Sequence, residues 1–126
     1  MRVLTFGTFD HFHPGHRAYL TEATGCGELF VVVARDASVR LIKNREALQK
    51  EEERAAGVRK EFPDATVMLG DPEDYLRPVR EVRPDLILLG YDQKLPPGVS
   101  ESDLPCPIER AKPFEPEKHK SSLRRG

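Results

Sequence analysis

The sequence predicts an α/β protein, a Rossmann-like three-layer fold with a mostly parallel sheet of about five strands. Short apolar runs of strand length alternate with longer stretches of helix-forming residues along the chain. The run at residues 29–34 is continuous and rich in β-branched residues, which is typical of a parallel strand covered by helices on both faces. With 126 residues, 38% of them hydrophobic, the chain is expected to form a single domain over 1–126.

The first third of the chain predicts a strand, a helix and a second strand. Residues 3–6 form an apolar run of strand length, and residues 14–23 begin with proline, which suits the first position of a helix. Together with the strand at 29–34 they predict a right-handed βαβ unit. Residues 36–39 then begin a short helical piece that leads into a basic patch at 40–45.

The remaining elements continue this alternation. Residues 46–62 are rich in helix formers and carry an apolar stripe, and two apolar runs of strand length follow them. Prolines limit regular structure beyond residue 94. The sequence predicts a helix within 46–62, a third strand at 65–69, a helix at 73–82 that Pro78 breaks or kinks, a fourth strand at 85–89 and an edge strand at 105–110.

The loop after the first strand, residues 7–16, reads Gly-Thr-Phe-Asp-His-Phe-His-Pro-Gly-His. Its proline places His13 at the helix cap and His16 in the first turn. The free N–H groups of that turn and the helix dipole attract phosphate oxygens, and two imidazoles three residues apart can reach one ligand. We expect Gly7 to allow a sharp turn out of the strand and Gly15 to let a ligand approach the backbone. The loop therefore predicts a phosphate site.

Two other interpretations of these histidines stay open from the residues alone. One is an ordinary helix cap or surface position. The other is a metal site to which His11 adds a third donor, although Cys26 and Cys106 are both distant in sequence. The strand–loop–helix context favours phosphate binding over both.

A second polar segment, Gly90-Tyr91-Asp92-Gln93, follows the predicted fourth strand. The carboxyl ends of parallel strands meet at one edge of a sheet, where α/β proteins bind their ligands. We therefore expect this segment and the loop at 7–16 to share one cleft. There Tyr91 could stack on a ring, while Asp92 and Gln93 could hydrogen-bond a base or a ribose.

Composition excludes several classes of partner. Twenty Lys and Arg against 21 Asp and Glu leave a net charge of −1, with no basic stripe to suggest nucleic acid. No apolar run approaches the roughly 20 residues that cross a membrane, and the N-terminal residues do not form a signal peptide. Two cysteines without short spacing indicate a reducing compartment. We expect a cytoplasmic protein with no nucleic-acid or membrane partner.

The motif Gly7-Thr8-Phe9-Asp10 followed by His13-Pro14-Gly15-His16 resembles the signature of the cytidylyltransferase-like nucleotidyltransferases, the HxGH superfamily. The resemblance implies transfer of a nucleotidyl group from a nucleoside triphosphate to a small phosphate-bearing acceptor, with release of pyrophosphate. It implies His13, His16 and Lys43 as catalytic residues and Arg54 as a candidate phosphate contact. It also implies nucleotide-binding roles for Gly7, Thr8, Phe9, Gly15, Gly90, Asp92, Gln93, Ser121 and Ser122.

The Gly-Tyr-Asp-Gln segment, followed by Lys94, resembles more narrowly the archaeal-type FAD synthases, which are FMN adenylyltransferases. The resemblance covers most of residues 1–94 and implies ATP and FMN as substrates, FAD as product, and a homodimer. It also implies Mg²⁺ carried with the triphosphate, with no metal-binding cage in the protein. The alternatives are a cytidylyltransferase acting on CTP and glycerol 3-phosphate, and a non-catalytic nucleotide-binding module. The near absence of a helix after Ser122 keeps the module alternative open.

Overall fold

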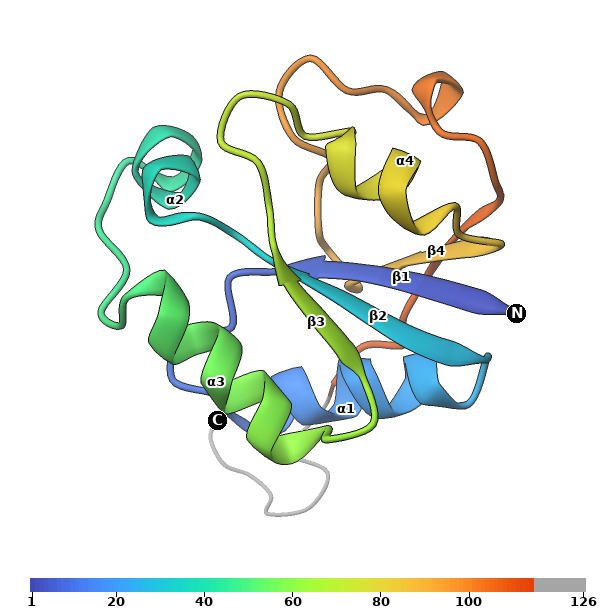
Figure 1. Ribbon diagram of the computed structural model, residues 1–126, viewed down its shortest axis with the longest axis horizontal. Helices are drawn as coiled ribbons and strands as arrows, with labels where there is room; N and C mark the ends of the chain where they lie inside the picture. Colours follow the sequence, from blue (N-terminus) through green and yellow to red (C-terminus); the bar gives the residue numbers. More distant parts are fainter. Residues whose placement is uncertain (115–126) are drawn as a thin grey trace.

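The computed structural model describes residues 1–114 and contains a five-stranded, fully parallel sheet in the order β3-β2-β1-β4-β5 (Figure 1). This confirms the predicted Rossmann-like α/β fold. The strands are β1 (Arg2–Gly7), β2 (Glu28–Val33), β3 (Thr66–Leu69), β4 (Leu86–Leu89) and β5 (Ile108–Arg110). The helices are α1 (Pro14–Thr24), α2 (Asp36–Lys43), α3 (Glu51–Glu61) and α4 (Arg77–Val82), with a 3₁₀ turn at Glu101–Asp103.

Apolar side chains on both faces of the sheet produce the three layers. Alternate strand residues point to opposite faces, so neighbours such as Val3 and Leu4 enter two separate cores. One core packs β1, β2 and β4 against α1 and α3, and the other packs the same strands against α4. Figure 1 shows α1 and α3 on one side of the sheet and α4 on the other. The predicted layer arrangement is confirmed.

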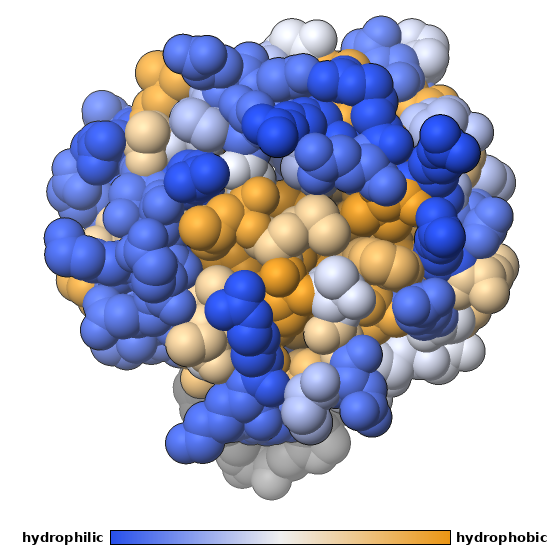
Figure 2. All heavy atoms as spheres, viewed as in Figure 1, coloured by the Kyte–Doolittle hydropathy of each residue, from blue (hydrophilic) through white to orange (hydrophobic). Residues whose placement is uncertain are grey.

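The edge strand β3 is covered less completely than the central strands. Thr66 is exposed and residues 67–69 are half-buried, whereas all four residues of β4 are buried. Figure 2 shows apolar side chains gathered in the middle of the face that has β3 in front, with hydrophilic side chains around them. The helices therefore cover the central strands of the sheet more completely than the edge strand β3.

Two helices differ from their predicted form. The helix α2 runs from Asp36 to Lys43, so that residues 40–43 of the basic patch lie on a helix. The helix α4 has six residues, and Pro78 lies in its first turn, where a missing N–H group costs no hydrogen bond. Proline therefore helps to start α4, and the prediction that it breaks a longer helix is wrong. The residues before it form a turn, in which Asp71 Oδ1 accepts the backbone N–H groups of Glu73 and Asp74.

The strands β1 and β4 separate toward their carboxyl ends. Their register pairs Val3 with Leu86 and Leu4 with Ile87, whereas β1 continues beside β2 as far as Gly7. The strand order reverses between β1 and β4, which is where open α/β sheets bind ligands. The separation gives the molecule a cleft at this point.

The Tyr19 hydroxyl from α1 bridges the gap between these two strands. It donates to the carbonyl oxygen of Leu88 at 2.5 Å and accepts the backbone N–H of Phe6 at 3.3 Å. Burial raises the pKa of the Tyr19 phenol above its ordinary value of 10, so the hydroxyl stays protonated and keeps donating. One side chain thus replaces part of the missing ladder between β1 and β4.

We predict that Tyr19→Phe lowers the free energy of unfolding by about 1–3 kcal/mol, because two buried backbone groups lose their partner. Urea denaturation measures the change. Tyr75→Phe is the matched control, since the Tyr75 hydroxyl makes no hydrogen bond with any residue of 1–114. Equal effects of the two substitutions would contradict the bridging role of Tyr19.

Candidate active site

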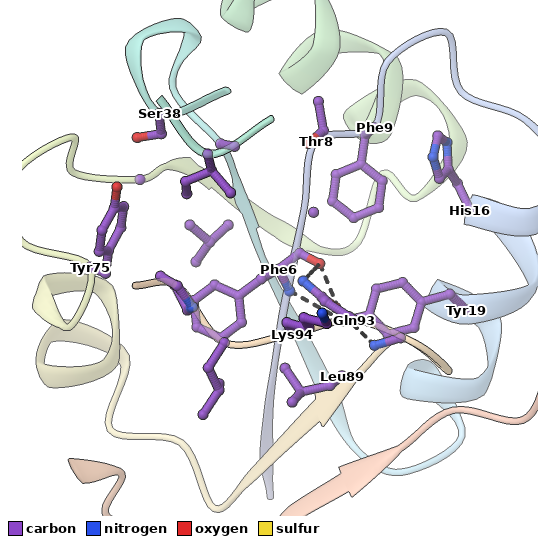
Figure 3. A pocket seen from close by; sticks show the side chains of 18 of the residues that line it. Phe6, Thr8, Phe9, His16, Tyr19, Ser38, Tyr75, Leu89, Gln93 and Lys94 are labelled. Atoms are coloured by element: carbon purple, nitrogen blue, oxygen red, sulfur yellow. Dashed lines mark hydrogen bonds between the residues drawn. The ribbon is translucent and has the colours of Figure 1, made fainter. Parts of the chain in front are cut away.

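A cavity of about 780 Å³ opens at the carboxyl ends of the central strands (Figure 3). It reaches from the loop between β1 and α1 to the segment that follows β4, so the two motifs predicted to share one cleft do so. The predicted site residues that line it are Gly7, Thr8, Phe9, His13, Gly15, His16, Lys43, Gly90, Asp92 and Gln93. Ser121 and Ser122 lie outside the described residues.

The two histidines form a reciprocal cap at the start of α1. His13 Nδ1 accepts the backbone N–H of Gly15 at 3.1 Å, and His16 Nδ1 accepts the backbone N–H of His13 at 3.2 Å. Their rings stack with centroids 3.6 Å apart. Because each Nδ1 accepts a hydrogen bond, the proton of each neutral ring must be on Nε2. Both rings therefore have an N–H donor that the cap does not use.

A buried phenylalanine fixes the position of the His16 ring. Phe9 is 2% exposed and lies edge-on to His16, with centroids 5.2 Å apart. Its backbone adopts a φ of 56°, which turns the chain out of β1 and drives its ring inward. A Cβ atom on Gly7 would lie 2.7 Å from the Phe9 ring. Gly7 therefore makes room for Phe9, and the prediction that Gly7 itself makes the sharp turn is wrong.

Gly15 also makes room for a ring inside the protein. A Cβ atom there would lie 3.0 Å from Cε1 of His13 and 3.2 Å from its Nδ1. The close approach lets the Gly15 N–H donate to that nitrogen. The two motif glycines are thus explained by the packing of the aromatic rings of Phe9 and His13.

Burial, and then the nearby His13 and Lys43, lower the pKa of His16 from 6.5 to about 4, although Asp10 opposes the shift. His16 is therefore neutral at pH 7 and acts as a hydrogen-bond donor without a net charge. Since protonation is disfavoured in the fold, the stability that neutral His16 contributes is complete above pH 6.5. It decreases as the pH falls from there toward 4.

Positive charge enters the cavity from the end of α2. Lys43 is the last residue of that helix and lines the cavity together with Arg45. Partial burial and then the positive charge of Arg45 lower the pKa of Lys43, while Asp10 opposes them. The chain turns sharply after Lys43 because Asn44 adopts a left-handed φ of 57°. This turn brings Arg45 to the same wall as Lys43.

Asp10 ties this basic wall to the histidine loop. Its carboxylate accepts the backbone N–H groups of Leu48 and Gln49, both at 2.9 Å, and the Gln49 side chain accepts the N–H of His11 at 2.9 Å. Burial opposes ionisation of Asp10, but these two N–H groups outweigh it and lower the pKa of the carboxyl group. The Asp of the motif therefore serves to connect two loops.

Arg54 does not line the cavity, and four of its five N–H donors are already in use. It is fully buried on α3, where Nη1 donates to the carbonyl oxygens of Thr8 at 2.9 Å and Ala34 at 2.8 Å. Its Nη2 donates to Asp36 at 2.7 Å and its Nε to the Gln49 carbonyl at 3.1 Å. The structure therefore contradicts the expected phosphate contact, because Arg54 instead joins the ends of β1 and β2 to the starts of α2 and α3.

In the segment after β4, Gln93 stabilises the fold, whereas Tyr91 and Asp92 line the cavity. The Gln93 side chain accepts the N–H of Gly90 at 2.8 Å and donates to the carbonyl oxygen of Phe6 at 3.1 Å, so its amide spans the gap between β1 and β4. This is a different use from the expected hydrogen bond to a base or ribose. Tyr91 is 59% exposed and Asp92 is exposed, and both line the cavity. The predicted ligand contacts of Tyr91 and Asp92 are sterically open.

A family model described as "Cytidylyltransferase-like" matches residues 4–104. The chain belongs to the cytidylyltransferase-like family. The FAD synthase of Methanospirillum hungatei is 42% identical over 123 residues, which cover 97% of this chain and 78% of that protein. The FAD synthase of Methanosarcina acetivorans is 41% identical over 104 residues, covering 82% and 68%. The crystal structure of a lipopolysaccharide core biosynthesis protein from Thermoplasma volcanium superposes with a TM-score of 0.81 at 34% identity, covering 91% of this chain and 98% of that one.

The comparisons confirm the resemblance drawn from the histidine motif and from the segment after β4. In this member of the cytidylyltransferase-like family, the residues that line the cavity include the hydroxyl-bearing Tyr19, Ser38 and Tyr75, which sequence reasoning did not single out. Tyr19 and Ser38 are ordinary helix residues in the sequence, so nothing marked them. Tyr75 lies between the third strand and its helix, and that position at the carboxyl edge of the sheet was a usable signal.

Within residues 1–114, no group of three or more His, Cys, Asp or Glu side chains is arranged to hold a metal ion. None of the helices in this part of the chain has the length and apolarity to span a membrane.

We predict that Arg54→Leu lowers the free energy of unfolding by about 3–5 kcal/mol, because Asp36 and three carbonyl oxygens lose a buried partner. Arg17→Leu is the matched control, since Arg17 pairs with Glu61 at a side chain that is 52% exposed, where ion pairs contribute under about 1 kcal/mol. Chemical denaturation of both variants makes the comparison. A small loss for Arg54→Leu would show that Arg54 is dispensable for the fold and would reopen its assignment to phosphate.

Proposed function

We propose that this protein is an FMN adenylyltransferase, which transfers AMP from ATP to FMN and releases pyrophosphate, forming FAD. The observation that carries the proposal is the stacked histidine pair at the cavity, whose two Nε2–H donors come from the N-cap and the first turn of α1. Its support for these two substrates is the similarity to proteins named FAD synthase, at 41–42% identity over most of the chain.

The histidine pair and the start of α1 provide the site for the triphosphate. In the reaction an FMN phosphate oxygen forms a bond to the α-phosphorus of ATP, and the bond from that phosphorus to the bridging oxygen breaks. Negative charge then builds on the oxygens of the leaving pyrophosphate. The Nε2–H groups of His13 and His16 donate to these oxygens, and the positive end of the α1 dipole adds to their attraction. Neutral His16 supplies this stabilisation without having to gain or lose a proton.

Lys43 and Arg45 provide the charge that brings the two anionic substrates together. A phosphate monoester has its second pKa near 6, so FMN enters largely as a dianion and needs no general base. Its repulsion from the triphosphate is the main electrostatic obstacle to attack. Two cations at one wall of the cavity reduce that repulsion and position the attacking oxygen.

Mg²⁺ that accompanies the triphosphate fits this site as an ion held mainly by phosphate oxygens and water. Both oxygens of Asp10 are already bonded to backbone N–H groups, whereas the exposed Asp92 side chain lines the cavity and would hold the water shell of the ion. The ion would neutralise part of the triphosphate charge.

A homodimer, a cytoplasmic location and a single domain over 1–126 stay predictions.

Incubation with Mg²⁺ and each pair of substrates tests the proposal. We expect pyrophosphate release and FAD formation with ATP and FMN. Release with CTP and glycerol 3-phosphate, and none with ATP and FMN, would replace the proposal by a cytidylyltransferase. ATP binding without release for any pair would indicate a non-catalytic module.

We predict that His16→Asn lowers kcat by about 10²-fold or more, because asparagine keeps an acceptor for the cap but loses the donor at Nε2. His11→Asn is the matched control. His11 has a φ of 48°, which asparagine tolerates, and its side chain does not line the cavity. We expect wild-type rates for His11→Asn, and equal losses in both variants would remove His16 from the reaction.

A further inference from the structure

We infer that the flavin ring of FMN binds in an apolar compartment of the cavity that Tyr75 borders and into which Ser38 brings a buried hydroxyl. The inference rests on the proposed function and deepens it. It places the acceptor specificity of the enzyme outside the histidine motif, on α2 and on the turn before α4.

The floor of this compartment is apolar. Phe6 of β1, Val32 of β2 and Leu89 of β4 line it from the sheet, and Leu76 and Val79 line it from the side of α4. Figure 3 shows the Phe6 side chain between Tyr75 and the centre of the pocket, with Leu89 at its base. An apolar floor of this kind favours a large, flat ring over a phosphate or a ribose.

Ser38 is the first sign that a ligand is expected here. Its residue is 5% exposed and lines the cavity, yet its hydroxyl makes no hydrogen bond with any residue of 1–114. A hydroxyl that lines a cavity and lacks a protein partner still has its donor and its acceptor to offer. A polar atom of a ligand in the compartment would supply the missing partner.

Tyr75 is the second sign. It is half-buried beside the same compartment, and its hydroxyl is likewise without a hydrogen-bond partner in the described part of the chain. In Figure 3 the hydroxyl of Tyr75 points toward the end of the pocket where Ser38 lies. An aromatic face and two hydroxyls above an apolar floor match a planar ring that is apolar along one edge and carries donors and acceptors along the other. The flavin ring has this pattern.

The direction of attack separates the flavin from the adenine. The attacking and leaving oxygens must lie roughly in line through the α-phosphorus. Since the leaving pyrophosphate is bound at the histidine pair, FMN must enter from the opposite wall. Figure 3 shows Tyr75 and Ser38 across the pocket from His16, so their compartment is on the side of the nucleophile. The adenine of ATP would then bind on the side of the cavity that Tyr91 and Asp92 line, after the end of β4.

Two tyrosines on different sides of one cavity allow a crossed test. Tyr75→Leu keeps an apolar side chain but loses the aromatic face, and we expect it to raise KM for FMN at least tenfold while KM for ATP stays within twofold. Tyr91→Leu is expected to do the reverse. Ser38→Ala, on a helix that alanine favours, is expected to raise KM for FMN about fivefold or more.

A binding measurement gives a readout independent of turnover. FMN is titrated with each variant in the presence of Mg²⁺ and a non-hydrolysable ATP analogue, and the flavin fluorescence is followed. Stacking on Tyr75 is expected to quench the fluorescence in the wild type, with a weaker quench and a raised Kd in Tyr75→Leu. Circular dichroism of each variant checks that it is folded.

The outcomes separate the inference from the proposed function. If the wild type makes FAD and Tyr75→Leu leaves KM for FMN unchanged, or raises KM for ATP instead, the flavin compartment is wrong and FMN adenylyl transfer stands. If the wild type neither binds FMN nor makes FAD, both are overturned.

Discussion

The site depends on two hydrogen bonds that run from the backbone to the Nδ1 atoms of His13 and His16. They cap α1 and at the same time fix where the proton sits on each ring. A helix start leaves N–H groups without intrahelical partners, and the chain uses two nearby N–H donors to orient the two histidine rings. The stacked rings, the Phe9 support and the absence of a Cβ on Gly7 all follow from holding this arrangement.

The rest of the fold keeps other groups at fixed positions around that pair. Arg54 joins loops from four elements at one buried guanidinium, and Asp10 binds the segment that follows Lys43. On the opposite side, Tyr19 and Gln93 bridge β1 and β4 where the strands separate. The cavity is therefore surrounded by side-chain bridges between loops, so its shape is set before a ligand arrives. Such preorganisation is how an enzyme without a covalent intermediate lowers its barrier.

Local patterns in the sequence were enough to predict the strands, the start of α1 and the meeting of the two motifs. Apolar runs specify buried strands, and Pro14 specifies a helix start, whatever lies elsewhere in the chain. The roles of Arg54 and Gln93 could not be predicted in this way, because their partners are backbone carbonyls and amides brought together only by the folded sheet. The sequence shows which side chain is present, but it does not show which backbone groups that side chain hydrogen-bonds in the folded protein.

The tautomer of His16 is the most direct test of this account. Long-range ¹H–¹⁵N NMR spectra of the ¹⁵N-histidine-labelled protein distinguish a protonated Nε2 from a protonated Nδ1 and from the imidazolium. We expect a neutral ring with its proton on Nε2 from about pH 8 down to about pH 5, since the pKa of His16 is about 4. A proton on Nδ1, or titration near the ordinary pKa of 6.5, would contradict it.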